Sequence, residues 1–181
     1  MIALVDGDIV AYRCAASCER TVDKVRVCIA DEATALLRTE QLMQTIIHST
    51  QSDKYRCFLS PHKNFRYDVY PKYKANRDDT IDPVHREACK QYLMAGWHAE
   101  LFEGYEADDA LAWSQTQAEY DGEGFNQREG TVICSIDKDL KQVPGKYYNF
   151  VNETWTDTNE VQGLSTFYQQ VLIGDKTDNL F

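Results

Sequence analysis

The sequence predicts an α/β fold in which a mostly parallel sheet is flanked by helices. Three short runs rich in apolar and β-branched residues, at positions 2–5, 55–59 and 131–136, have the length and composition of strands buried on both faces. Longer segments with the apolar spacing of helices separate them, an alternation typical of parallel sheets. The 181 residues suffice for one domain with a hydrophobic core, and no repeat or internal linker divides them, so we expect a single domain over 1–181.

One long helix is expected between the first two strands. Residues 31–48 carry apolar side chains at helical spacing. Five of these should face the core: Leu36, Leu37, Met43, Ile46 and Ile47. Residues 25–29 can form either a strand after a loop or one arm of a hairpin, and the sequence favours neither.

Another helix should follow the second strand. Asp82 is a suitable N-cap and Pro83 suits the first helical position, so this helix should run to about Ala95 and stop at Gly96. Residues 98–102 then form a candidate strand that leads into an acidic segment.

This acidic segment, Gly-Tyr-Glu-Ala-Asp-Asp-Ala at 104–110, should begin a helix that continues to about Tyr120. Its inward face would carry Ala107, Ala110, Leu111 and Ala118. Three acids lie in or near the first turn: Glu106, Asp108 and Asp109. A helix N-terminus tolerates negative charge, which is the ordinary explanation, but three acids there repel one another and a cation would compensate them.

The last third of the chain should add two further elements to the fold. Residues 121–130 are polar and glycine-rich and should form a loop. Residues 147–151 are a candidate outer strand, and residues 152–159 look like a turn-rich connection. A helix is expected over Glu160–Ile173, ended by Gly174.

Acids also follow other predicted strand and helix ends. Asp6 follows the first strand, at the edge where open α/β sheets build ligand sites, although a turn alone would explain it. Asp137 and Asp139 follow the third strand, and alternate residues of an extended chain point to one side. The alternative, a helix N-cap, needs only one of them. Asp175 and Asp178 are one helical turn apart.

These acids together form a candidate metal site. Without His or Cys among the ligands, oxygen atoms alone favour Mg²⁺ or Mn²⁺ over zinc. The candidate ligands are Asp6, Glu106, Asp108, Asp109, Asp137, Asp139, Asp175 and Asp178.

A basic and aromatic segment at residues 62–77 is the candidate nucleic-acid contact. Cations bind phosphates and aromatic rings stack on bases, so the mixture suits single-stranded or frayed nucleic acid. A solvated loop with aromatic rings packed beneath it explains the segment equally well. Lys74 and Arg77 would point the same way in a helical turn. The candidate DNA contacts are Lys63, Arg66, Lys72, Tyr73, Lys74 and Arg77.

The composition restricts the function further. The net charge of −10 argues against a general nucleic-acid coat protein, which should be basic. The six cysteines form no Cys-x-x-Cys pair and the four histidines are scattered, so a structural zinc site is not expected. No signal peptide and no membrane-length apolar run is recognisable, so a cytoplasmic protein without membrane contact is expected.

Five motifs in order resemble the 5′–3′ exonuclease and flap endonuclease family, which includes the 5′-nuclease domain of bacterial DNA polymerase I and phage exonucleases. They span almost the whole chain: Leu4-Val5-Asp6-Gly7, Tyr73-Lys74-Ala75-Asn76-Arg77, Gly104-Tyr105-Glu106-Ala107-Asp108-Asp109, Ser135-Ile136-Asp137-Lys138-Asp139-Leu140 and Ile173-Gly174-Asp175-Lys176-Thr177-Asp178-Asn179.

The resemblance implies a three-layer, twisted, PIN-like or resolvase-like 5′-nuclease domain. It also implies that the acids bind two Mg²⁺ ions, with Mn²⁺ as a substitute, and that Lys74 and Arg77 act in catalysis by gripping the phosphate at the scissile bond. The expected substrate is DNA with a 5′ end or 5′ flap, in replication or repair. The expected products carry a 5′-phosphate and a 3′-hydroxyl.

Two departures from the family pattern are visible. Ser60 holds a position after the second core strand where the family often has a further acid, so one metal ligand is missing and water could replace it. The family also continues into a helix-hairpin-helix module that holds duplex DNA, whereas this sequence ends at Phe181. We therefore expect that module to be absent from this chain, either because the chain is truncated or because a partner chain supplies the grip on duplex DNA.

Two other functions remain open on the sequence alone. A PIN-type ribonuclease would share the fold class and act on RNA. A metal-stabilised domain that binds branched DNA would be catalytically weak. The Tyr-Lys-Ala-Asn-Arg segment and the doublet Asp108-Asp109 favour the DNA-directed nuclease.

Overall fold

The structure is a computed structural model that describes residues 1–75, 81–117 and 130–174. Its main sheet has six strands in the order β5-β4-β1-β6-β7-β8. All neighbouring pairs are parallel except β7 and β8, which are antiparallel. The strands are β1 (Ile2–Asp6), β4 (Lys54–Leu59), β5 (Glu100–Leu101), β6 (Thr131–Cys134), β7 (Gly145–Asn149) and β8 (Thr154–Thr158).

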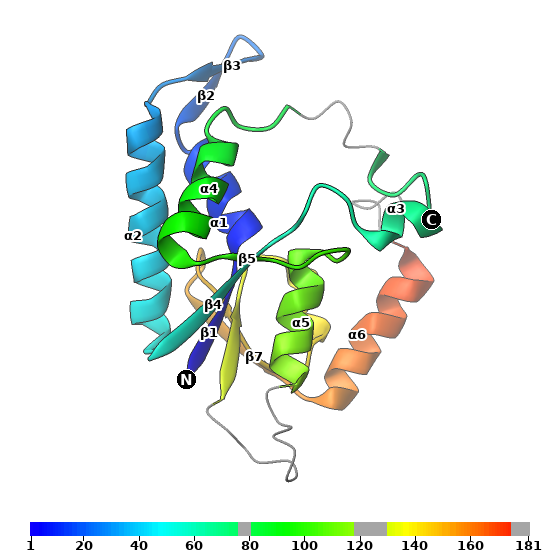
Figure 1. Ribbon diagram of the computed structural model, residues 1–181. Helices are drawn as coiled ribbons and strands as arrows, with labels where there is room; N and C mark the ends of the chain where they lie inside the picture. Colours follow the sequence, from blue (N-terminus) through cyan, green and yellow to red (C-terminus); the bar gives the residue numbers. More distant parts are fainter. Residues whose placement is uncertain (76–80, 118–129, 175–181) are drawn as a thin grey trace.

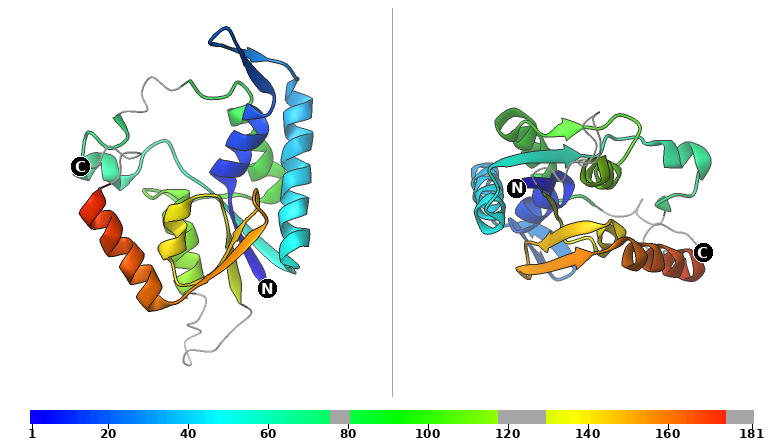
Figure 2. Two further views of the ribbon diagram at one scale, coloured as in Figure 1. Left: turned by 180° about the vertical axis from the view of Figure 1, so that it is seen from behind. Right: turned by 90° about the horizontal axis from the view of Figure 1, so that it is seen from below.

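Helices cover both faces of this sheet and create three layers (Figures 1 and 2). On one face lie α1 (Gly7–Ala16), α2 (Glu32–Thr50) and α4 (Arg86–Trp97); on the other lies α5 (Ala107–Gln117). Helix α6 (Glu160–Ile173) packs beside the 3-10 helix η2 (Lys138–Gln142). The remaining elements are a hairpin of β2 (Glu19–Val22) and β3 (Val25–Cys28) and the short α3 (Phe65–Val69). This architecture confirms the predicted α/β fold class.

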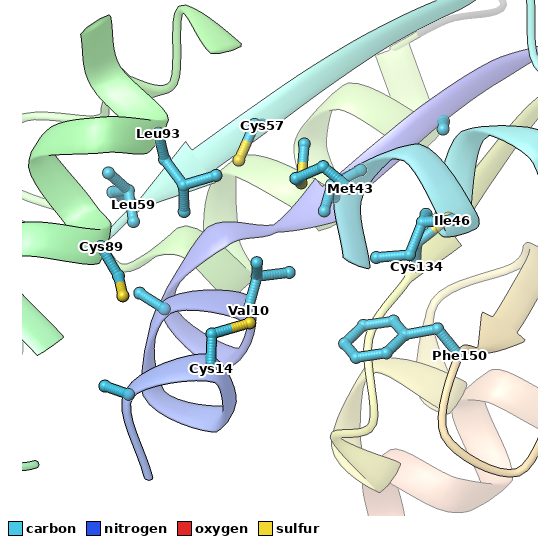
Figure 3. Packing of buried hydrophobic residues seen from close by; sticks show 14 of the residues in the cluster. Val10, Cys14, Met43, Ile46, Cys57, Leu59, Cys89, Leu93, Cys134 and Phe150 are labelled. Carbon is cyan, nitrogen blue, oxygen red and sulfur yellow. The ribbon is translucent and has the colours of Figure 1, made fainter. Parts of the chain in front are cut away.

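The central strands are buried on both faces, as their composition predicted. Ala3 and Val5 of β1 face the layer of α1, α2 and α4, whereas Leu4 between them faces α5. The larger core lies on the first side, where Met43 and Ile46 of α2 pack near β-strand side chains (Figure 3). Five cysteines in this core, including Cys57 and Cys134, pack as small apolar residues, and all six cysteines are unpaired.

The close approach of α1 to the sheet depends on Gly7. A Cβ at this position would lie 2.7 Å from the Phe58 carbonyl oxygen and 2.9 Å from the Cys57 sulfur, so only glycine lets α1 begin against β4. Asp6 ends β1 and caps α1 by accepting a 3.1 Å hydrogen bond from the Ile9 N–H. Asp6 is therefore held at the junction between the carboxyl end of β1 and the start of α1.

The predicted helices are present, with two corrections. Within α2, Leu37 is 56% exposed and does not face the core. Helix α4 begins at Arg86 and not at Asp82, because the Val84 N–H donates to the Glu19 carboxylate of the hairpin and Asp82 pairs with Arg86. The helix also continues through Gly96 to Trp97. Of the two alternatives for residues 25–29, the structure shows the hairpin arm, which is strand β3.

The largest error concerns residues 152–159, which we expected to be a connection. They include β8, so β7 is an inner strand that pairs with both β6 and β8. The turn is confined to a few residues because the Asn149 side chain accepts hydrogen bonds from the Val151 and Asn152 N–H groups. Trp155 then packs on Tyr148, with ring centroids 5.0 Å apart.

Other expectations differ only at the ends of elements. Strand β5 has two residues where we expected 98–102, and β6 ends at Cys134, two residues early. Helix α6 and its end at Gly174 are as predicted. The expected loop at 121–130 lies almost wholly outside the described residues. No helix in the described parts of the chain has both the length and the apolar character needed to cross a membrane.

Candidate active site

A cleft of about 1770 Å³ opens at the carboxyl edge of the parallel strands. Six of the eight predicted acids line it, together with three of the predicted cations and aromatics. These residues are Asp6, Glu106, Asp108, Asp109, Asp137, Asp139, Arg66, Tyr73 and Lys74. The predicted Asp175, Asp178 and Arg77 lie outside the described residues. The topology thus brings side chains more than a hundred residues apart to one edge of the sheet.

Asp6 lies at the bottom of this cleft and is 2% exposed. Burial raises the pKa of its carboxyl to about 7, and the negative charges of Asp8 and Asp137 act in the same direction. Hydrogen bonds from the Ser135 hydroxyl, at 2.7 Å, and from the Ile9 N–H oppose this rise. Within the described residues, Asp6 therefore receives hydrogen bonds, but no cation is among the groups that lower its pKa.

Asp108, in the first turn of α5, is in a similar environment. Burial raises its pKa well above the usual range, and the charges of Asp6, Asp137 and Glu106 raise it further. Lys74 acts in the opposite direction but does not reverse the rise. Because the charge of Asp137 acts on both Asp6 and Asp108, the three carboxylates lie close together, and a divalent cation would stabilise them.

Glu106, by contrast, is fully engaged by polar groups of the protein. Its carboxylate accepts hydrogen bonds from Lys74 Nζ at 2.8 and 3.0 Å, from Asn64 Nδ2 at 2.8 Å and from the Tyr73 hydroxyl at 3.0 Å. Lys74 reaches it from a left-handed backbone conformation, with φ of 55°. A non-glycine residue held in this region stores strain, and such residues concentrate at functional sites.

Asp109 is held by a guanidinium. Arg66 donates two hydrogen bonds to it, at 2.6 and 2.7 Å, in a fork, and the Glu106 N–H donates a third at 3.0 Å. Burial alone would raise the pKa of Asp109, but these donors, Arg66 first, lower it below the usual value. Asp109 therefore stays ionised and joins α3 to the start of α5.

Only the first of the two acids after β6 has an extended backbone, because Asp139 lies within η2, which corrects the expectation of an extended chain through both. Asp137 is the N-cap of η2 and accepts a 2.9 Å hydrogen bond from the Asp139 N–H, so the N-cap alternative was the right one for Asp137. Asp139 points toward α6, where its carboxylate accepts a hydrogen bond from the Gln170 amide. Both still line the cleft.

The predicted DNA-contact segment splits between exposed and buried side chains. Lys63 and Lys72 are exposed. Tyr73 is only 4% exposed, and its ring packs against Tyr67 and beneath the Lys74 ammonium. Its ring is therefore not available for base stacking, contrary to expectation, and packing beneath the segment explains it better.

The side chains of the cleft have the chemistry expected of a Mg²⁺ or Mn²⁺ site, but they are not arranged around a single ion. Within the described residues, no three His, Cys, Asp or Glu side chains are placed to hold one ion. The physical reason is that several acids are bound to Lys74, Arg66 or Gln170, while Asp6 and its neighbours repel one another. The donor set contains oxygen only and carries uncompensated charge, which is what Mg²⁺ or Mn²⁺ requires.

Several residues in the cleft were missed from the sequence. Asp8 and Lys90 form an ion pair at 3.0 Å in its wall, and Asn64 and Ser135 orient Glu106 and Asp6. Only Asp8 carried a signal, because it lies two residues after Asp6 in the same strand-to-helix turn. The other three reach the site through tertiary contacts, which no local pattern shows.

With this geometry in view, comparison with known proteins assigns the chain to a family. It belongs to the family described as 5′-3′ exonuclease, N-terminal resolvase-like domain, whose model matches residues 1–170. DNA polymerase I of Chloroflexus aurantiacus is 27% identical over 147 residues, which cover 79% of this chain and 15% of the polymerase. DNA polymerase I of Borreliella burgdorferi is 31% identical over 137 residues, covering 68% and 14%. The chain thus spans about one seventh of the length of these relatives.

Solved structures agree with the fold. A mutant of the T5 5′-exonuclease superposes with a TM-score of 0.65 at 15% identity, over 98% of this chain and 64% of that one. A T5 protein co-crystallised with metal ions gives a TM-score of 0.68 at 17% identity, over 98% and 68%. The predicted family and its three-layer α/β fold are both confirmed.

Proposed function

We propose that this domain hydrolyses DNA phosphodiester bonds at a 5′ end or 5′ flap, as a 5′–3′ exonuclease or flap endonuclease. The products would carry a 5′-phosphate and a 3′-hydroxyl. Family membership supports a nuclease in general. The observation that carries the proposal is the convergence of Asp6, Asp108 and Asp137 in one cleft beside the Lys74 ammonium. Buried acids that repel one another are costly to a fold, and such perturbed groups concentrate at functional sites.

The acids would hold two Mg²⁺ ions, with Mn²⁺ as a substitute. Asp6, Asp108 and Asp137 are the central candidates because they form no ion pair in the described parts of the chain, and Glu106 lies beside Asp108. Asp109, Asp139, Asp175 and Asp178 complete the set that the family resemblance implies. When bound, two such ions supply a nucleophilic hydroxide and stabilise the leaving oxygen.

The protein's own cations would hold the substrate. Lys74 lies in the cleft wall on Glu106, within the charge field of Asp108, and would contact the phosphate at the scissile bond. Asn64 and Tyr73 donate hydrogen bonds to the same carboxylate, so Glu106 holds Lys74 in a fixed position. Arg77 would assist as the resemblance implies, and the exposed Lys63 and Lys72 would contact DNA further from the site. A partner chain that grips duplex DNA would add affinity to this cleft.

A cleavage assay tests the proposal. The substrate is a 5′-flap duplex labelled at its 5′ end, incubated with Mg²⁺, with Mn²⁺ and with EDTA, beside an RNA strand of the same sequence. We expect metal-dependent cleavage of the DNA, with released mononucleotides indicating exonuclease action and a released flap indicating endonuclease action. Preferential cleavage of RNA would favour a PIN-type ribonuclease. Binding of the flap without cleavage in either metal would favour a branched-DNA-binding domain.

A further inference from the structure

We propose that Asp8 is an additional carboxylate of this metal centre, which enters the cleft from the first turn of α1 beside the end of β4. The proposal rests on the function proposed above but concerns a residue outside the matched motifs. Asp8 lines the same cleft as Asp6 and Asp137. Its negative charge acts directly on the buried Asp6 carboxyl, so the two lie close together.

The position of Asp8 is fixed by the backbone. Oδ2 of Asp8 accepts a 2.8 Å hydrogen bond from the Ser60 N–H, so the carboxylate spans the ends of the neighbouring strands β1 and β4. Gly7 permits this contact because α1 starts in van der Waals contact with Phe58 and Leu59. The carboxylate therefore lies at a defined point of the cleft, as a metal ligand must.

The other oxygen of Asp8 has unused hydrogen-bonding capacity. Oδ1 is buried and accepts no hydrogen bond within the described residues. Lys90 Nζ lies 3.0 Å from it as an ion pair, but off the hydrogen-bond direction, and donates instead to the Ser60 carbonyl at 3.1 Å. Lys90 therefore compensates the charge of Asp8, while Oδ1 keeps its capacity to accept a further ligand.

Ser60, at the end of β4, contributes no charge of its own to this point of the cleft. Its hydroxyl accepts the Ala107 N–H at 2.9 Å and so caps the start of α5. Because its N–H donates to Asp8, the charge at the end of β4 comes from the carboxylate of α1.

Lys90 is then the counter-ion of Asp8 in the metal-free protein. Its ammonium comes from α4 and also donates to the Ser60 carbonyl. An ion pair that served stability alone would make no difference to metal binding. A metal-binding role for Asp8 predicts that removing its charge weakens metal binding even when Lys90 is removed with it.

Metal binding can be measured without any cleavage. Mn²⁺ alone is titrated into the full chain, and free Mn²⁺ is counted by electron paramagnetic resonance, with isothermal titration calorimetry as a second measurement. We expect Asp8→Asn to lower Mn²⁺ affinity by about tenfold or more, because loss of a ligand or its support typically costs 10- to 100-fold. Asp157→Asn, an exposed acid on β8, is the matched control and should bind as the wild type does.

Two further variants keep the test decisive if Asp8→Asn folds poorly. Asp8→Asn/Lys90→Met removes the unpaired ammonium and should show the same loss of affinity. Asp8→Ser/Ser60→Asp moves the carboxylate to position 60 and should regain most of the affinity. Wild-type affinity in folded Asp8→Asn, or in the double variant with Lys90→Met, would overturn the proposal.

The same titration separates this proposal from the one on which it rests. If the wild type binds no Mn²⁺, the metal-dependent function itself fails, and the role of Asp8 with it. If Asp137→Asn weakens Mn²⁺ binding while Asp8→Asn does not, the metal centre stands and only the role of Asp8 is refuted.

Discussion

The cleft contains two groups of carboxylates that differ in what neutralises them. Glu106 and Asp109 are each held by a cation from the segment before α4, Lys74 and Arg66 respectively, and Asp109 has a lowered pKa. Among the residues that the structure describes, Asp6, Asp108 and Asp137 form no ion pair. Burial, together with the charges of neighbouring acids, raises the pKa of Asp6 and of Asp108. The two groups are neighbours in one cleft and share the start of α5.

This difference separates two roles within one set of acids. Carboxylates that are paired inside the protein fix the geometry of the cleft and hold Lys74 in place. Carboxylates that are not paired take up either a proton or an external cation. A metal ion should therefore bind chiefly to the second group, and the variants below should affect the two groups differently.

The largest effect is expected for Asp137→Ala, within the unpaired group. Loss of this carboxylate should abolish Mg²⁺-dependent cleavage, with a rate decrease of about 10³-fold or more, because metal charge stabilisation contributes several kcal/mol to the transition state. The measurement is the cleavage rate of the 5′-flap substrate at saturating Mg²⁺. Turnover retained under these conditions would refute the role of Asp137.

A second substitution at this position separates its charge from its cap. Asp137→Asn can still accept the Asp139 N–H and cap η2, so the fold should be preserved. The rate should nevertheless fall as far as in Asp137→Ala. Asp157→Ala, on the outer strand β8, is a control that should cleave at the wild-type rate.

Lys74→Met should produce the next largest effect. It removes the cation that donates to both oxygens of Glu106 and would hold the phosphate, so we expect a rate decrease of about 100-fold from the loss of charge-assisted contacts. Mn²⁺ affinity in the same variant should be kept or should increase, because Glu106 is released. A parallel loss of metal binding would contradict the separation between paired and unpaired acids.

The unpaired group should also control how stability depends on pH. Folding raises the pKa of Asp6 from 3.8 to about 7, so the folded protein binds more protons than the unfolded chain between these values. The stabilisation from protonated Asp6 is fully present below pH 3.8 and is lost as pH rises through about 7. The free energy of unfolding of metal-free protein should therefore fall over this interval.

Asp6→Asn checks this assignment, because Asn still caps α1 but does not titrate. Urea unfolding from pH 4 to pH 8 should show a smaller fall in the variant than in the wild type. Added Mg²⁺ should reduce the fall in the wild type, since a bound cation lowers the pKa of its ligands. The same pH dependence in both proteins would show that Asp6 is not the responsible group.

Much of this arrangement could be predicted from local sequence patterns. Apolar runs and caps fixed the positions of β1, β4, β6 and α6, and a parallel sheet places the ends of its strands at one edge. From that rule alone, Asp6 and Asp137 were expected to meet Glu106 and Asp108. The clustering of these acids follows from topology and needs no knowledge of side-chain contacts.

What could not be predicted is which acid is paired with which cation. Arg66 and Asp109 are 43 residues apart, and Lys90 reaches Asp8 from a different helix, α4. Such pairs depend on loop paths and side-chain rotamers, which have no periodic signal. The same limit explains the wrong prediction for Tyr73. The basic and aromatic composition of its segment suggested base stacking, whereas its hydroxyl donates a hydrogen bond to Glu106.

The smallest effect is expected for Arg66→Met, within the paired group. Asp109 would lose both guanidinium hydrogen bonds and keep the one from the Glu106 N–H, so the free energy of unfolding should fall by about 2 kcal/mol. Urea unfolding at pH 7 without metal measures this. Arg56→Met is the matched control, because Arg56 makes a similar fork to Glu100, but at the exposed sheet edge, and should cost less than about 1 kcal/mol. Equal losses in the two variants would mean that the Arg66–Asp109 pair is an ordinary surface ion pair and does not anchor the start of α5.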